Sequence, residues 1–251
     1  MEIKIDPETN TLVRAGVKNI INPFDAYAIE EGVRIKERFD DGEAEVIALT
    51  MGPPQSEEIL REAISVGVDR AILLSDRAFA GADTWATSAT LARAIDMIGE
   101  CSLVILGKQT LDGDTGQVGP ELAHRLNIPF IGYASSIPEI SGNKIKVKRL
   151  MEDRYETFEI KLPAAVSVVK DINIPRVPSL RGKMKAKNVE IPVWDAVKLG
   201  VNEDEVGLSG SYTQVIKIFT PDIKHEIKMI KGSTEEQVEQ LYKELKKLNV
   251  I

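Results

Sequence analysis

The amino-acid sequence predicts an α/β protein: a doubly wound parallel sheet with a small antiparallel section, an extended arm and a C-terminal helix. Two observations predict this fold class. Residues 20–130 alternate helical patterns with short apolar runs that end at turn residues, which is typical of βαβ units and a parallel sheet. From residue 131 to residue 169 the apolar side chains change to a period of two, which indicates antiparallel strands.

End signals mark the helices and strands of the first part. Asn22 precedes Pro23, a pattern in which a helix cap is followed by proline at the first helical position. The strands are short aliphatic and β-branched runs, as in strands buried on both faces. Two helices end at glycines, Gly67 and Gly99. The expected order is a helix from residue 23, a strand at 44–50, a helix at 56–66, a strand at 71–74, a helix at 84–98, a strand at 103–106 and a helix at 118–126.

The second part of the chain has a different character. Residues 144–148 and 158–162 alternate apolar and polar side chains, so we expect two strands of the antiparallel section there. Residues 170–192 are basic and marked by prolines, and we expect an extended arm. Residues 207–232 are expected to form a loop with one short strand.

The last helix is expected over residues 233–248. Ser233 and Glu236 have the spacing of a capping box, which marks a helix start. The apolar side chains share one face of this helix, and the charged ones lie elsewhere. That apolar stripe consists of Val238, Leu241, Leu245 and Leu248.

Composition excludes several classes of function. The chain has 251 residues and a formal net charge of -7, so we expect no nucleic-acid partner. No run of about 18 apolar residues occurs, so we expect no membrane insertion. The one cysteine, Cys101, permits neither a disulfide framework nor a paired-cysteine metal site, which fits a reducing compartment, and we expect a cytoplasmic protein. We predict no catalytic side chains and no metal ligands, because the histidines, His124 and His225, have no ligand partner nearby in the sequence.

The loops that follow the parallel strands are where ligands bind in open α/β sheets. This rule selects residues 51–55, 75–83 and 107–117. Residues 107–120 contain several glycines between a strand and a helix, so the backbone can approach a phosphate and the helix start can bind it. A plain tight turn explains the same pattern equally well.

Two further stretches carry chemical signals, each with an alternative. Residues 76–88 combine small side chains with hydroxyls, which suits a flat ligand, although the spacing alone favours Asp83 as a helix cap. Residues 169–187 have the composition of a solvated basic linker. Leu180 and Met184 are apolar residues four apart within that stretch, and they favour a short amphipathic segment that meets a partner.

Together these stretches resemble the β subunit of electron transfer flavoproteins. Residues 175–187, with Leu180 and Met184, are similar to the family's hallmark segment. The start of the glycine-rich loop at Gly107, its Gln117 and residues 21–25 match as well. The resemblance covers nearly the whole chain and implies a Rossmann-like, adenine-nucleotide-binding domain that pairs with an α subunit carrying FAD.

The family has two branches, and both are considered for this chain. In one branch the β subunit holds AMP as a structural nucleotide. In the other it holds a second FAD that accepts a hydride from NADH and splits the electron pair. Residues 76–88 and 112–120 are similar to the FAD-holding, electron-bifurcating members. A nucleotide-sensing regulatory α/β protein is the alternative from another class.

The resemblance also implies the site residues. Asn22, Phe24 and Met51 would lie near the adenosine, and Asp83, Thr84 and Thr87 near the flavin ring. The phosphates would meet Gly113, Gly116, Gln117 and Val118, and the remaining cofactor residues are Gly107, Gln109, Asp114 and Thr115. Leu180, with Met184 beside it, would anchor a partner dehydrogenase.

The implied function is electron transfer from NADH to the α-subunit FAD, a dehydrogenase and a low-potential acceptor. The dehydrogenase would be of the acyl-CoA type or another flavin enzyme, and the acceptor a ferredoxin or flavodoxin. Enzyme status stays open: the chain would oxidise NADH with its partner subunit if its cofactor is FAD. The expected domains are residues 1–192, which bind the nucleotide and include the arm, and residues 193–251, which contact the partner.

One departure from the family pattern concerns the sheet. Family members have an apolar strand and a Val-Pro-Asp turn ahead of the equivalent of residues 3–7, and this sequence lacks both. That strand would be a middle strand of the parallel sheet. Unless that strand precedes the start of this sequence or another segment fills its place, we expect unpaired backbone groups on both neighbouring strands, each costing roughly 1–3 kcal/mol. Nucleotide contacts from the loop after that strand are not assigned.

Overall fold

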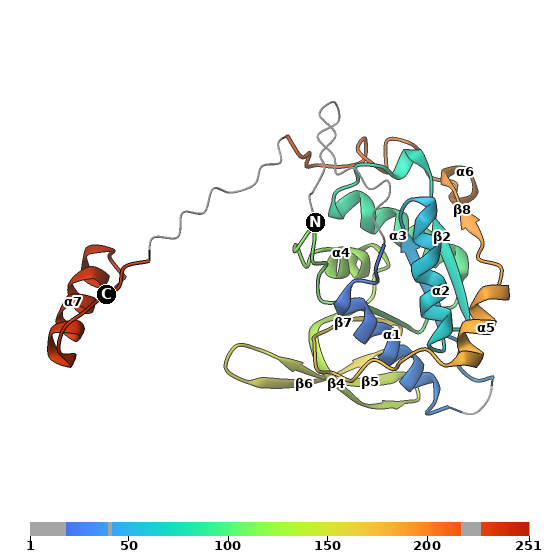
Figure 1. Cartoon of the computed structure of the whole chain (residues 1–251). Helices are drawn as coiled ribbons and strands as arrows, with labels where there is room; N and C mark the ends of the chain where they lie inside the picture. The colour runs from blue at the N-terminus through green and yellow to red at the C-terminus, as the bar shows by residue number, and fades with distance from the viewer. Residues whose placement is uncertain (1–18, 40–41, 217–226, 251) are drawn as a thin grey trace. The chain divides into compact units, whose positions relative to one another are not determined.

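The computed structural model describes residues 19–39, 42–216 and 227–250 (Figure 1). The chain divides into two compact units, one through Ile216 and one from Lys217, and each is described by itself. The expected strand between residues 207 and 232 does not occur in the described part of that range, and residues 217–226 lie outside it. Residues 3–7 and His225 also lie outside the described residues.

The first unit contains a parallel sheet of three strands. Its order is β1 (Ile47–Met51), β2 (Arg70–Leu74) and β8 (Val193–Trp194), all parallel. The two-residue strand β8 was not expected from the sequence, because two residues are too few to show a period. A short helix, α6 (Ala196–Leu199), follows it and packs Leu199 into the core beside β2.

A second sheet has five strands in the order β3, β7, β4, β5, β6. Parallel pairing joins β3 (Leu103–Gly107) to β7 (Ala164–Val168) and β7 to β4 (Phe130–Ser141). Antiparallel pairing then joins β4 to β5 (Lys144–Leu150) and β5 to β6 (Tyr155–Lys161). This is the small antiparallel section that the period of two predicts.

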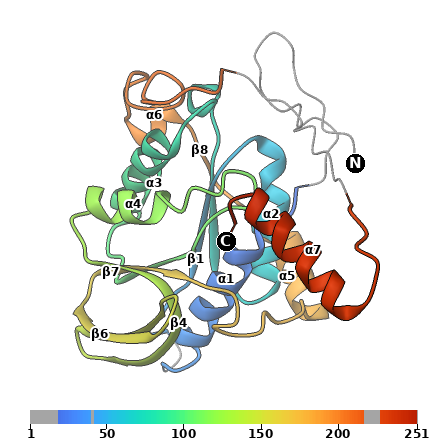
Figure 2. The same cartoon turned by 90° about the vertical axis from the view of Figure 1, so that its left-hand side faces the viewer.

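Helices cover both faces of the parallel strands, so the fold is doubly wound. Figure 2 shows α1 (Pro23–Lys36) and α2 (Glu57–Ser65) on one side, with α3 (Thr84–Ile98) and α4 (Val118–Arg125) on the other. Side chains of β1 alternate accordingly: Ala48 packs toward α1 and α2, whereas Ile47 and Leu49 pack toward α3. The predicted α/β class is therefore confirmed.

The two sheets meet at β1 and β3, which are not paired with each other. Among the described residues each pairs on one edge, β1 with β2 and β3 with β7. Helix α1 spans this gap, because a Cβ on Gly32 would lie 3.4 Å from Val46 Cγ1 and 3.9 Å from Ile105 Cδ1. All five residues of β1 are only half-buried, although β7 beyond β3 is fully buried. Within the described residues, the parallel sheet is interrupted between β1 and β3.

The basic arm is extended only in its first part. Residues 180–188 form α5 (Leu180–Asn188), which begins where the Ser179 hydroxyl accepts a bond from the Gly182 amide at 3.0 Å. Helix α5 packs on α2 so closely that a Cβ on Gly182 would lie 2.0 Å from the Ser65 carbonyl oxygen. Arg61 of α2 donates to the Ala186 carbonyl at the other end of α5. The helix forms because α2 offers it a docking surface.

Ahead of α5, the arm is tied to α1 by one arginine. Arg176 Nε lies 2.8 Å from Glu30 Oε2, and its Nη1 lies 2.6 Å from Glu37 Oε1. Arg34 also contacts Glu30, at 2.7 Å. Glu30 is almost fully buried, so these ion pairs fix the path of the arm over α1.

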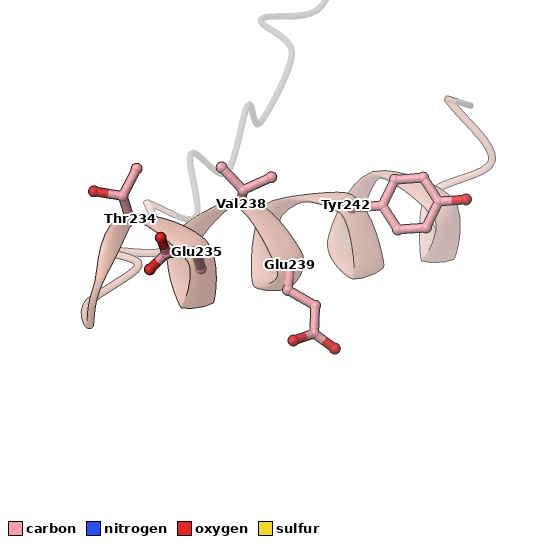
Figure 3. A pocket seen from close by; sticks show the side chains of 5 residues that line it. All are labelled: Thr234, Glu235, Val238, Glu239 and Tyr242. Atoms are coloured by element: carbon pink, nitrogen blue, oxygen red, sulfur yellow. The ribbon is translucent and has the colours of Figure 1, made fainter.

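The second unit consists of α7 (Thr234–Lys247) and its flanking residues. It begins with the predicted capping box, in which Glu236 N–H donates to the Ser233 hydroxyl and Glu236 accepts from the Ser233 amide. An open hollow of about 500 Å³ runs along one flank (Figure 3). The hollow is lined by Thr234, Glu235, Val238, Glu239 and Tyr242. Because these side chains project from a single helix, the hollow is an exposed flank rather than an enclosed cavity.

Candidate functional site

The candidate site lies at the carboxyl ends of the parallel strands, where the starts of α1, α3 and α4 converge. The start of α1 is joined to the residues that follow β3, and the start of α3 is joined to α4. This is the edge at which ligands bind in open α/β sheets. Loops that the sequence selected, at residues 75–83 and 107–117, therefore lie side by side.

Helix α1 is docked onto the end of β3 by buried polar contacts. The Gly107 amide donates to Asp25 Oδ1 at 2.7 Å, and Asn22 Nδ2 donates to the Gln109 carbonyl and to Asp25 Oδ2, both at 2.9 Å. A Cβ on Gly107 would lie 2.6 Å from the Cβ of Phe24, so only glycine permits this approach. Burial raises the pKa of the Asp25 carboxyl, against the lowering effect of these hydrogen bonds. The sequence predicted that Asn22 caps α1, but its side chain makes no capping bond. Instead, it ties the helix to the residues that follow β3.

The glycine-rich loop leads into a helix start that no side chain caps. Asp114 and Gly116 have positive φ values of 51° and 64°, and an aspartate tolerates that conformation better than most residues. Gln117 is the residue before α4, and its side chain makes no capping bond. The amides of Val118 and Gly119 thus remain available to bind an anion.

The start of α3 is held by Asp83. Its Oδ1 accepts from the Ala86 amide at 3.0 Å, which is the helix cap that the spacing favoured. Its Oδ2 accepts from the amides of Tyr212 and Thr213, at 2.9 and 3.0 Å. Burial raises the pKa of this carboxyl, but these hydrogen bonds outweigh burial and hold it below its usual value. Asp83 thus fastens the segment around residue 212 to α3.

Polar atoms without partners concentrate at this edge. Four buried side-chain nitrogen or oxygen atoms have no hydrogen-bond partner within the described part of the chain. Three of them are Asn19 Nδ2, Asn22 Oδ1 and Glu121 Oε2, on segments that converge here. The Thr84 hydroxyl, which lies 3.1 Å from Glu121 Oε1 and 3.3 Å from Gln117 Oε1, faces the same place. Buried polar groups normally have partners, so this edge fits a polar ligand that supplies them.

Most of the predicted cofactor residues are brought together, and some are not. The converging set is Asn22, Phe24, Gly107, Gln109, Gly113, Asp114, Thr115, Gly116, Gln117, Val118, Asp83 and Thr84. Thr87 lies one turn into α3, and Met51 at the end of β1 packs into the hydrophobic cluster against α3. Leu180 and Met184 are separate from this edge: they lie on α5, with 79% and 62% of their surfaces exposed.

Sequence reasoning did not single out three residues that the structure places here. Asp25 was visible only as part of the segment 21–25, although it binds the Gly107 amide directly. Asn19 gave no signal of a site, and the partner of Glu121, Thr84, lies 37 residues away in the chain. For Glu121 the available signal was an acidic residue in the first turn of the helix after the glycine-rich loop.

Two kinds of site are not found among the described residues. No group of three or more His, Cys, Asp or Glu side chains within residues 19–39, 42–216 and 227–250 is placed to hold a metal ion. None of the helices in the described part of the chain is long and apolar enough to cross a membrane.

These features define a doubly wound α/β protein with a polar, glycine-rich ligand edge. Comparison with known proteins then identifies its family. Residues 9–199 match the family model described as the electron transfer flavoprotein domain. The chain belongs to the electron transfer flavoprotein family and is a β subunit of that family.

Several curated relatives match over most of the chain. The caffeyl-CoA reductase-Etf complex subunit CarD of Acetobacterium woodii is 45% identical over 251 residues, covering 100% of this chain and 95% of its own length. The electron transfer flavoprotein subunit beta of Megasphaera elsdenii is 45% identical over 226 residues, with 88% and 83% covered. Protein FixA of Azotobacter vinelandii is 43% identical over 226 residues, with 88% and 79% covered.

Proposed function

We propose that this chain holds FAD at the carboxyl edge of its parallel strands and works in a heterodimer with an electron transfer flavoprotein α subunit. The observation that carries this proposal is the placement of orphan polar atoms on both sides of the glycine-rich loop. Asn22 directly precedes α1, and Glu121 contacts Thr84 at the start of α3. Asn22 Oδ1 and Glu121 Oε2 have no hydrogen-bond partner among the described residues. A ligand that satisfies both has polar groups at either end of a phosphate segment, as a dinucleotide has.

Three groups of residues would each bind one part of the FAD molecule. Asn22, beside Gln109, would bind the adenosine end, and the uncapped start of α4 at Val118 would bind the diphosphate. Thr84 and Thr87, on the start of α3, would lie beside the flavin end. When bound, FAD would supply the capacity to accept a hydride. The chain itself would bind, orient and shield the group rather than act through a catalytic side chain.

NADH is the proposed electron donor, and the acceptors are the α-subunit FAD, a dehydrogenase and a ferredoxin or flavodoxin. One relative is named as a subunit of a caffeyl-CoA reductase-Etf complex, which supports a dehydrogenase that acts on acyl-CoA substrates. The exposed Leu180 and Met184 on α5 would contact that dehydrogenase. The exposed apolar side chains of α7 would pack on the α subunit.

AMP as a structural nucleotide is the second candidate. One observation favours it: the Asp83 carboxylate is fully engaged by the chain's own amides, so it is not free to bind a flavin ring. AMP would need only the α1 side and the start of α4. The orphan oxygen of Glu121, on the α3 side, would then stay without a partner.

Anaerobic titration with NADH tests the FAD proposal. The chain is co-purified with its α subunit, and flavin absorbance is followed in the wild type and in Gly116→Val. Valine is strained at a φ of 64°, so the variant should lose the nucleotide of this chain and no longer be reduced by NADH. The matched control is Gly142→Val, which is strained at a φ of 56° in a turn away from the site and should behave as wild type. Equal reduction of Gly116→Val and wild type would show that NADH reacts elsewhere, and the proposal would be wrong.

A further inference from the structure

A carboxyl group lies beside the helix start that would bind the diphosphate. Glu121 belongs to the first turn of α4, and its amide donates to the Gln117 carbonyl at 3.1 Å. Its side chain turns toward α3, where Oε1 accepts from the Thr84 hydroxyl at 3.1 Å. The second oxygen, Oε2, is buried and has no hydrogen-bond partner. This geometry suits a protonated carboxyl group, because a proton on Oε2 would let that oxygen donate a hydrogen bond.

The charged groups near Glu121 are Asp83 and Arg125, and they act on its pKa in opposite directions. Asp83, at the start of α3, faces it with a negative charge. Arg125 lies one turn further along α4, but its guanidinium stacks on the Trp85 ring at 3.8 Å. Its Nε and Nη2 donate to Ser88 Oγ and to the Trp85 carbonyl, both at 3.0 Å. The guanidinium of Arg125 is thus held by contacts with α3, and it makes no hydrogen bond to Glu121.

Apolar side chains pack against one side of this turn. Strands β3 and β4 lie behind it, and a Cβ on Gly119 would lie 3.0 Å from side-chain atoms of both Leu106 and Phe130. Burial raises the pKa of the Glu121 carboxyl and the Asp83 charge raises it further, whereas the Thr84 hydrogen bond and the Arg125 charge oppose this; the net shift is upward. A diphosphate at the start of α4 would add negative charge close by, which disfavours the ionised carboxylate still more.

We propose that Glu121 takes up one proton from solvent when the dinucleotide binds, and that its neutral carboxyl donates a hydrogen bond from Oε2 to an oxygen of the ligand. The proton converts the carboxylate to the acid, and the ligand keeps its charge. This inference rests on the proposed function, because it needs an anionic ligand at α4. It makes Glu121 a ligand-binding residue that couples cofactor affinity to pH.

The direction of the coupling follows from linkage. Proton uptake on binding means that affinity falls as the pH rises. The fall is at most about tenfold per pH unit, and it is confined to the interval between the pKa of Glu121 in the free chain and that in the bound chain. Outside that interval the affinity is independent of this group.

Calorimetric titration of the nucleotide-free full chain with FAD tests the inference. The internal diphosphate of FAD keeps its charge from about pH 5.5 to about pH 8, a range that covers raised glutamate pKa values. Buffers of different ionisation enthalpy report the number of protons taken up per FAD. Wild type should take up as much as one proton within this range, with a Kd that rises as the pH rises. Glu121→Gln should bind FAD without proton uptake and with a Kd that does not change.

The control is Glu58→Gln, which removes an exposed carboxylate from the first turn of α2 and should keep full proton uptake. Wild type binding FAD without proton uptake at any pH, or Glu121→Gln retaining the uptake, would overturn the inference and leave the proposed function standing. Failure of the wild type to bind FAD would overturn the proposed function and this inference together. The proton count of the wild type needs no variant, so a poorly folded Glu121→Gln protein would not block the test.

Discussion

Replacing Arg176 with methionine should destabilise the chain by about 2 kcal/mol. Its partner Glu30 has a side chain only 4% exposed, and removing one member of a fully buried ion pair costs roughly 3–5 kcal/mol. Two features reduce that value here. The Arg176 side chain is 33% exposed, and Arg34 still contacts Glu30 at 2.7 Å after the change. Methionine keeps most of the apolar contacts that the arginine stem makes. The loss of unfolding free energy therefore measures the contribution of the guanidinium charge.

Urea unfolding of the full chain at neutral pH measures this free energy. Arg154→Met is the matched control, because Arg154 pairs with Asp153 and Glu156 on the surface with 59% of its side chain exposed. The control should lose no more than about 0.5 kcal/mol. Equal losses in the two variants would refute the claim that Arg176 stabilises a buried charge.

The pH dependence of the Arg176→Met effect has a defined sign. Burial raises the pKa of Glu30, but hydrogen bonds from Arg176 and Arg34 outweigh it and hold the pKa below the ordinary value of 4.5. A depressed carboxyl pKa gives stability that is present above the unfolded value and is lost as the pH falls through the folded value. The stability gap between wild type and Arg176→Met should therefore be largest above pH 4.5 and narrow below it. A gap that widens at low pH would contradict this assignment.

Three further predictions concern the docking helix and the divided sheet. Gly182→Ala should displace α5, because the added Cβ would lie 2.0 Å from the Ser65 carbonyl oxygen, and near-ultraviolet spectra and proteolysis of the arm would show it. Leu180→Ala should slow electron transfer to a dehydrogenase several-fold while the flavin content stays unchanged, and equal rates would exclude the anchor role. Amides of β1 and β3 that face the gap should exchange hydrogen much faster than those of β2 and β7, because no strand among the described residues pairs with them there; equal protection would show that the gap is filled.

Much of the fold followed from local signals in the sequence. The strands that became β1, β2 and β3 are short aliphatic runs, and Asp83 and Ser233 cap their helices as their spacing predicted. These features depend on residues close together in the chain.

Features that depend on distant partners did not follow from the sequence. The side chain of Asn22 has the type and position of a helix cap, but its bond to Gln109, 87 residues away, redirects it. Residues 180–188 looked extended, yet Gly182 lets them form a helix against α2. Glu121 became recognisable only when α3 placed Thr84 beside it. Contacts between distant parts of the chain determine each of these three features, so local sequence propensity does not predict them.

The flavin count of the purified heterodimer tests the central claim most directly. The chain is purified with its α subunit, the protein is denatured, and the released nucleotides are separated and quantified against the protein concentration. The account predicts two FAD molecules per heterodimer, one from each subunit, and no AMP. One FAD together with one AMP per heterodimer would contradict it, because the carboxyl edge of this chain would then hold a structural nucleotide.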